Sequence, residues 1–330
     1  MFTATCVPHT SYYSTPEFLL NISHYLTLIS FPVSFYGAYC ILYKTPVQLN
    51  SLKWLMLNLH FWTSSTDFLL VFIGIPYILM PTMSGFGLGI MKHTGILLYF
   101  FITILEASAV SVIAIFENRY FVMFAQKSRW RHYRKPFLTA ISSLVPLVFL
   151  PPYFDIPNQT FAREVVYSQL SCVVPFEING RPLFVLSVDL KLPLGCLVFN
   201  SILWSSLASV FFFLTIFKLW KGTERAISQK TIKLQKKLAF AVIFQTVVLV
   251  IFLLAPVCIC LFVITTDYHN QSLNNFSLII LSLHGLASTI AMLFVNKPYR
   301  EFTFSLVFCW RLMKNNTTPR SNVHSLSVIF

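Results

Sequence analysis

Seven long apolar runs constrain this chain more than any other feature of its sequence. They cover residues 18–43, 52–80, 93–116, 137–153, 192–217, 238–265 and 276–295. A run of about 20 apolar residues is long enough to cross a bilayer as a helix. Among acidic residues, the runs contain only Asp67 and Glu106. We therefore predict an all-α membrane protein built as a bundle of seven transmembrane helices.

The composition agrees with lipid as the main solvent of the chain. Hydrophobic residues make up 56% and charged residues 11% of the sequence, whereas soluble domains contain about 25% charged residues. The formal net charge of +13 suggests nucleic-acid binding at first sight. That function needs a polar surface, which this chain lacks, so we predict no nucleic-acid partner and assign the basic residues to loops of a membrane protein.

The basic residues are distributed very unevenly between alternate loops. The loops after the first, third and fifth runs and the tail, counted with Lys53 at the inner start of the second run, hold 20 Lys and Arg residues, and the remaining segments hold 4. Basic loops stay in the cytoplasm. This bias predicts an extracellular N-terminus (1–17), a bundle (18–296), a membrane-surface helix (297–314) and a cytoplasmic tail (315–330).

Four stretches, each placed on a different part of the bundle, resemble one receptor family. They are STPEFLL from Ser14, KWLMLNLHFWTSSTDFLL from Lys53, IFENRY from Ile115 and LHGLASTIAMLFVNKPYRE from Leu283. Together they resemble the nematode serpentine chemoreceptors of class H (Srh) in the Str superfamily, from Cys6 to Arg300. The chain departs from the family at Asn296, where a histidine is usual, so any proton-linked role of that histidine is absent.

The resemblance implies a chemosensory G-protein-coupled receptor. Its ligand would be a small, apolar odorant or pheromone, and its cytoplasmic partner a heterotrimeric G protein. Its location would be the plasma membrane, in the cilia of chemosensory neurons. No enzymatic activity, metal or cofactor is expected, because HExxH, GxSxG, GxGxxG and P-loop stretches are absent from the sequence.

Arg119 occupies the position of the switch arginine in rhodopsin-like receptors. Its acidic neighbour, Glu117, is two residues away, or about 200° around a helix, so a direct pair is disfavoured. Glu117 is expected to reach a basic residue before the sixth run, such as Lys236 or Lys237. The expected switch set is Glu117, Arg119, Tyr120, Pro298, Tyr299 and Arg300. The alternative is an interfacial arginine that only sets topology.

Three ionisable residues fall at a similar depth in the predicted bundle. At 1.5 Å per residue, Asp67, Glu106 and His284 lie roughly 21, 16 and 18 Å from the inner ends of their runs. Ionisable groups in a membrane are costly and mark candidate functional sites. We predict a midplane polar cluster of these three, with Ser288 and Thr289 nearby. It either holds an ion or a proton, or it is a structural hydrogen-bond network.

The outer segments offer three further candidate sites. Cys6 and Cys172 are the cysteines placed outside, where a disulfide is expected in this family; free thiols are the alternative. Asn158 begins an N-glycosylation sequon. The outer halves of the third, fifth, sixth and seventh helices should enclose a ligand pocket. By position, we expect its lining to include His93, Tyr99, Phe184 and Asp189.

The segment after Pro298 predicts a short helix on the inner leaflet, with Cys309 as a candidate palmitoylation site. A plain apolar cysteine is the alternative.

Two other functions of multi-span membrane proteins are alternatives for the whole chain. A ligand-gated cation channel of the insect odorant-receptor kind would need the opposite charge bias. A transporter would show inverted repeats and interrupted helices in matching halves, and neither is visible here.

Overall fold

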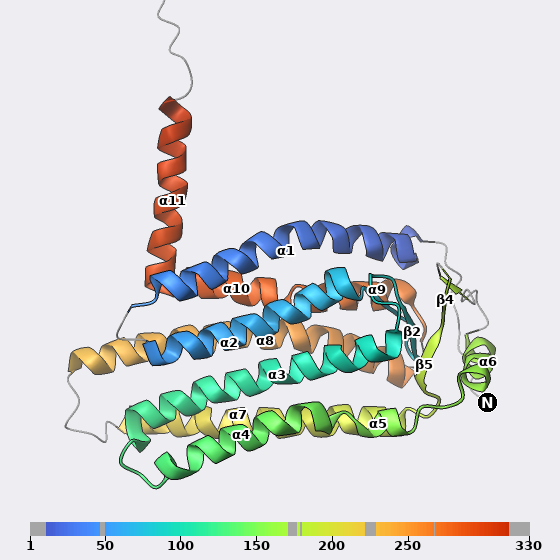
Figure 1. The fold of residues 1–330 in the computed structure, drawn as a ribbon, viewed down its shortest axis with the longest axis horizontal. Helices are drawn as coiled ribbons and strands as arrows, with labels where there is room; N and C mark the ends of the chain where they lie inside the picture. The colour runs from blue at the N-terminus through green and yellow to red at the C-terminus, as the bar shows by residue number, and fades with distance from the viewer. Residues whose placement is uncertain are drawn as a thin grey trace, which may run out of the picture.

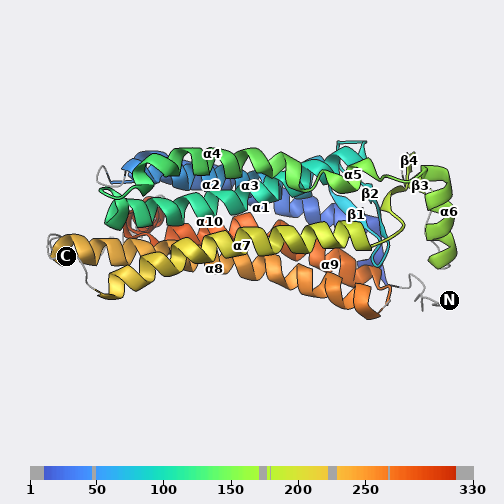
Figure 2. The same ribbon diagram turned by 90° about the horizontal axis from the view of Figure 1, so that it is seen from below.

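The computed structural model describes residues 11–46, 50–170, 177–178, 180–221, 229–266 and 268–316. For residues 50–51, 219–221, 229–239, 242 and 307–316 it describes the backbone alone. Long helices run side by side to form one elongated bundle (Figure 1). A small sheet lies at the end where α1 begins, which we call the sheet end. We call the opposite end, from which α11 extends in Figure 1, the Arg119 end. Figure 2 shows the same bundle from below, with the sheet at one end.

Seven helical segments of the described chain run along the bundle. They are α1 (Pro16–Lys44), α2 (Asn50–Phe68) with the π-helical turn η3 (Leu69–Ile73), α3 (Thr94–Tyr120) with the π-helical turn η4 (Phe121–Ala125), α4 (Trp130–Val148), α7 (Lys191–Lys221), α8 (Gln229–Thr266) and the pair α9 (Gln271–Ser282) and α10 (His284–Val295). The predicted seven-helix bundle is confirmed.

The outer surface of the bundle is apolar, unlike that of a soluble protein. On α8, Ile251 and Leu254 have 58% and 56% of their surface exposed, whereas Thr66 on α2 and Ser288 on α10 are 0% and 1% exposed. Apolar side chains on the outside and hydrogen-bonded polar groups inside are what lipid requires of a helical bundle. Six helical segments of the described residues are long and apolar enough to cross a membrane.

The seventh segment, α2, is more polar, and the polar residues on its inner face are covered by protein. It contacts α1, α3 and α10, so its polar residues Thr63, Asp67 and His60 are buried at 1%, 1% and 5% exposure. The 19 residues of α2 and the 5 of η3 rise roughly 36 Å at 1.5 Å per residue. That length is sufficient to cross the hydrocarbon core.

The sequence predicted a helix over the whole second apolar run, to residue 80. The structure ends that helix earlier. The helix ends at Ile73, and Gly74 and Pro76 follow. The rest of the run forms β1 (Pro76–Ile78), which pairs antiparallel with β2 (Met83–Gly87), and β2 pairs with β5 (Phe184–Ser187). The other elements at the sheet end are η1 (Tyr12–Ser14), α5 (Pro151–Phe154), α6 (Gln159–Gln169), β3 (Glu177–Ile178) and β4 (Arg181–Pro182).

Hydrogen bonds join the sheet end to the bundle. The Tyr77 hydroxyl on β1 donates to the Ser14 carbonyl at 2.7 Å. The amide of Gln271 on α9 donates to the Ile78 carbonyl at 3.0 Å, and that of Asn275 donates to the Tyr13 carbonyl at 2.9 Å. Loop carbonyls buried without such donors would be costly, so these contacts fix the sheet over the ends of α1 and α9.

Helix α11 (Lys297–Asn316) leaves the Arg119 end and runs across the direction of the bundle helices (Figure 1). Its first turns are attached to α1. The Tyr299 hydroxyl lies 2.7 Å from that of Thr45, and the Lys44 ammonium lies 3.9 Å from the centroid of the Phe302 ring. Burial raises the pKa of the Tyr299 phenol, more than its bond to Thr45 lowers it. Tyr299 therefore holds the helix as a neutral group.

Candidate functional site

The seventh transmembrane segment is interrupted inside the membrane, and Asp67 is bound to the interruption. Helix α9 ends at Ser282 and α10 begins at His284. The first N–H groups of a helix have no partner within it. Here the backbone N–H groups of Gly285 and Leu286 donate to the two carboxylate oxygens of Asp67, at 3.0 and 2.7 Å. Asp67 therefore caps α10 from a neighbouring helix.

His284 completes this cap. Its Nδ1 lies 2.9 Å from Asp67 Oδ1 and 2.9 Å from the Leu281 carbonyl oxygen. Both neighbours accept hydrogen bonds, so Nδ1 carries a proton that it shares between them. The positive end of the α10 dipole and three donors thus surround one carboxylate that is 1% exposed. This arrangement satisfies Asp67 with protein groups alone.

The structure brings Asp67 and His284 together, but Glu106 bonds elsewhere. Glu106 Oε1 accepts a hydrogen bond of 2.7 Å from Asn200 on α7. Ser288 accepts from Gln245 on α8 at 3.1 Å, and Thr289 donates to the Gly285 carbonyl at 2.8 Å. The residues at similar depth therefore belong to separate contacts. Among the described residues no group of three His, Cys, Asp or Glu could hold a metal ion.

Gly285 is required at the cap because there is no room for a side chain. A Cβ at this position would lie 2.6 Å from the Thr63 carbonyl oxygen and 2.7 Å from Asp67 Oδ2. We expect Gly285→Ala to push α10 away from α2 and lower the unfolding free energy by about 1–3 kcal/mol. Thermal inactivation of the purified receptor measures this. The control is Gly195→Ala on α7, where a Cβ meets nothing within 4 Å. Equal stability of the two variants would contradict the cap geometry.

A second set of contacts lies at the Arg119 end and gives Glu117 two partners on α4. Arg134 on α4 donates to both carboxylate oxygens, from Nε at 3.2 Å and from Nη2 at 3.0 Å. The indole of Trp130 donates to Oε1 at 2.7 Å. The turn after η4 reverses the chain, so α4 starts beside the end of α3 and supplies both donors. The side chains of Lys236 and Lys237 lie outside the described residues.

The arginine of the predicted switch, Arg119, is buried on the same stretch of α3 as Glu117. Arg119 is 4% exposed, and Glu117 is 0% exposed. The Lys218 ammonium on α7 donates to the Tyr120 hydroxyl at 3.5 Å. Contacts of α3 with α4 and α7 therefore surround the IFENRY stretch. We call Glu117, Trp130 and Arg134 the α3–α4 clasp.

The other predicted switch residues lie at the start of α11. Tyr299 is 2% exposed and bonds to Thr45, as described above. Arg300 Nη1 donates to the Phe294 carbonyl at 2.9 Å, and Pro298 stands at the second position of the helix. Asn296, the departure from the family pattern, donates from its amide to the Met292 carbonyl at 2.8 Å. These residues form the corner between α10 and α11.

Three of the four predicted ligand-pocket residues line one cavity. It has a volume of about 540 Å³ at the sheet end, and it lies between the start of α3, the end of α4, α5, α6 and β5. His93, Tyr99 and Phe184 line it, and Arg163 and Lys92 bring positive charge. Asp189 is elsewhere, on the surface, 3.7 Å from Lys191. The cavity thus lies farther toward α4 than the sequence predicted.

The remaining predictions concern modification sites. Asn158 is exposed and caps α6, because its side-chain oxygen accepts from the Thr160 backbone N–H at 3.0 Å. Its sequon remains a prediction. Cys6, Cys172 and the tail beyond Asn316 lie outside the described residues, as does the side chain of Cys309 on α11.

Sequence reasoning missed the partners of the buried acids. Asn200 is a single amide within the fifth apolar run, and that isolation was a usable signal for a buried polar contact. Arg134 and Trp130 stand in a loop-like basic stretch, where no local pattern marks them as partners of Glu117.

Seven helices with a buried arginine near the end of the third define the class of seven-transmembrane receptors. Residues 14–309 match the family described as "Serpentine type 7TM GPCR chemoreceptor Srh". The chain belongs to this family of chemoreceptors. It is also 23% identical over 314 residues to Serpentine receptor class H-72 of Caenorhabditis elegans. The aligned region covers 93% of this chain and 90% of the relative.

Proposed function

We propose that this protein is a chemosensory receptor that binds a small, apolar odorant or pheromone and activates a heterotrimeric G protein. The sheet end faces the outside, the Arg119 end faces the cytoplasm, and the receptor works in the plasma membrane of sensory cilia. The observation that carries the proposal is the α3–α4 clasp beside buried Arg119 in a chain of the chemoreceptor family.

The clasp describes a resting state in this proposal. Glu117 is held by Arg134 and Trp130, and the Arg134 guanidinium lies 3.9 Å from the centroid of the Phe121 ring. These contacts keep α4 against the end of α3. Arg119, on the same stretch of α3, is 4% exposed. A G protein that approaches from the cytoplasm meets Arg119 only after the clasp opens. Ligand binding has to favour the open state by differential affinity.

Replacing Arg119 tests the proposal. We expect Arg119→Ala to reach the cell surface and to lose most ligand-dependent G-protein activation. The measurement is a G-protein dissociation reporter in transfected cells exposed to a panel of volatile alcohols, ketones and esters. The control, Arg129→Ala, removes an exposed arginine of the neighbouring turn and should signal normally. Normal signalling by Arg119→Ala at equal surface expression would remove the switch role.

A further inference from the structure

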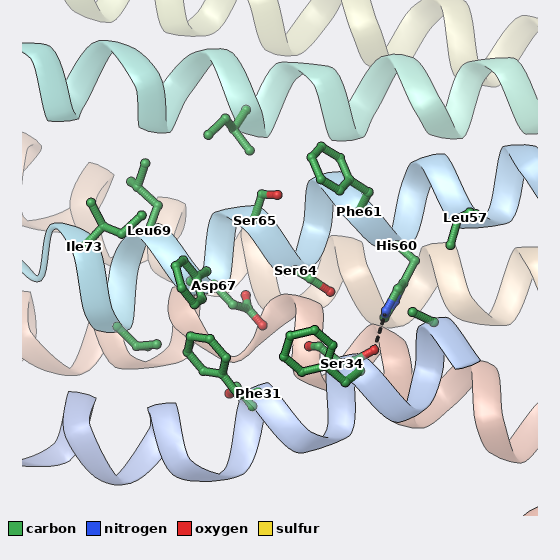
Figure 3. A pocket seen from close by; sticks show the side chains of 16 residues that line it. Phe31, Ser34, Leu57, His60, Phe61, Ser64, Ser65, Asp67, Leu69 and Ile73 are labelled. Carbon is green, nitrogen blue, oxygen red and sulfur yellow. Dashed lines mark hydrogen bonds between the residues drawn. The ribbon is translucent and has the colours of Figure 1, made fainter. Parts of the chain in front are cut away.

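A second cavity opens sideways between α1 and α2, at the middle of the bundle. Its volume is about 560 Å³, within the range of small-molecule sites. Figure 3 shows Phe31 from α1 and Phe61, Leu69 and Ile73 from the α2 segment around it. At its rim, Phe35 and Phe61 are 71% and 57% exposed, whereas Val71 in its wall is fully buried. The cavity is thus reached from the side of the bundle, where lipid lies.

Four serines line this apolar cavity, and their hydroxyls make no hydrogen bond within the described part of the chain. The four are Ser30 and Ser34 on α1 and Ser64 and Ser65 on α2. A helical serine ordinarily donates to the carbonyl one turn earlier. On α3, Ser108 and Ser111 do so, at 3.2 and 2.8 Å. The hydroxyls of Ser30 and Ser64, which are buried without a partner among the described residues, can therefore bond to an occupant of the cavity.

These hydroxyls are well placed for an occupant. Ser30 is 4% exposed, and Ser34 and Ser65 are half-buried in the cavity wall. A serine hydroxyl has three staggered positions about one bond, so each oxygen can turn toward a group in the cavity. The backbone carbonyl of Ser34 is already used, because His60 Nε2 lies 2.8 Å from it (Figure 3).

Depth selects the chemical class of the occupant. Ser30 is the central residue of the 29-residue helix α1, so it lies roughly 21 Å from either end at 1.5 Å per residue. Phospholipid head groups and sterol hydroxyls stay at the membrane surface and do not reach this depth. A small molecule dissolved in the bilayer core can reach it, with an apolar body among the phenylalanines and one oxygen on the serines.

We propose that this cavity is a binding site for a membrane-dissolved aliphatic alcohol, ketone or ester, reached from the bilayer between α1 and α2. The inference rests on the proposed function in that it names the ligand class of the receptor. The cavity also borders the α10 cap, because Asp67 lines its wall beside the π-helical turn η3. An occupant therefore touches the residue that holds the interrupted seventh segment.

The test uses two photoreactive probes on the full-length receptor in lipid nanodiscs. One is a decanol with a diazirine on its chain, and the other is the matching decane. We expect the alcohol to label peptides of α1 and α2 around Ser30 and Ser64, several-fold more than the hydrocarbon does. The double variant Ser30→Ala, Ser64→Ala should reduce labelling by the alcohol about tenfold, since each lost hydrogen bond weakens binding. Labelling by the hydrocarbon should not change.

Two controls keep the test decisive. Ser143→Ala on α4 removes a hydroxyl that bonds the Thr139 carbonyl away from the cavity and should leave labelling intact. Ala38→Trp fills the cavity and should exclude both probes in a receptor that elutes as a folded species. Equal labelling by the two probes, insensitive to the serines, would overturn the site, as would labelling confined to the cavity of His93 and Tyr99. Labelling as expected without any G-protein activation would refute the proposed function and leave this site standing.

Discussion

Asp67→Ala is expected to lower the unfolding free energy of the receptor by about 2–6 kcal/mol, because it leaves two buried backbone donors unpaired and each unpaired donor costs about 1–3 kcal/mol. The substitution leaves the N–H groups of Gly285 and Leu286 without an acceptor in a region that excludes water. It also removes the carboxylate from His284, which is 0% exposed. Thermal inactivation and the fraction of monodisperse receptor measure the loss.

Asp189→Ala is the matched control for this prediction. Asp189 is an aspartate with a 67% exposed side chain whose pairing partner, Lys191, is 91% exposed. Exposed pairs contribute little, and the bond of 3.0 Å that Asp189 accepts from the Lys191 backbone N–H is a helix cap that contributes about 1 kcal/mol. This variant should therefore lose much less stability than Asp67→Ala. Asp67→Asn separates capping from charge. The asparagine oxygen can accept a hydrogen bond from one of the two backbone N–H groups, whereas its NH₂ group is a donor and cannot accept from the other. A variant Asp67→Ala as stable as Asp189→Ala would show that the α10 terminus finds other partners.

The sequence predicted the helical bundle because length and hydropathy determine where a chain can cross lipid. It also predicted the depth of Asp67 and His284, since depth follows from residue number along a helix. Their contact depends on which face each helix turns inward. The depth of Glu106 placed it with the same pair, but the rotation of α3 directs it to Asn200 on α7.

The interruption of the seventh segment had no clear signal either. Leu283 and His284 stand within a continuous apolar run without proline. The break is stable because Asp67, 217 residues earlier in the chain, supplies acceptors for the new helix terminus. A tertiary contact thus decides a local secondary structure. The same holds at the sheet end, where residues 76–78 form a strand because β2 is available to pair with them.

The α3–α4 clasp gives the prediction with the largest expected effect on signalling. If the clasp holds the resting state, Glu117→Gln should raise ligand-independent G-protein activation several-fold, because an amide cannot provide a charge for Arg134. Arg134→Ala should act in the same direction. A G-protein dissociation reporter, normalised to surface expression, measures both. Glu301→Gln, which changes a 64% exposed acid at the same end of the bundle, should leave basal activity unchanged.

The charge swap Glu117→Arg with Arg134→Glu distinguishes a clasp from two independent residues. A re-formed ion pair should return basal activity part of the way toward that of the parent. Recovery should stay incomplete, because Trp130 loses the acceptor that its indole now uses at 2.7 Å. Residues in direct contact typically show coupling of about 0.5–3 kcal/mol, enough to change basal activity measurably. Additive effects of the two substitutions would mean that Glu117 and Arg134 act independently and that their ion pair does not set basal activity.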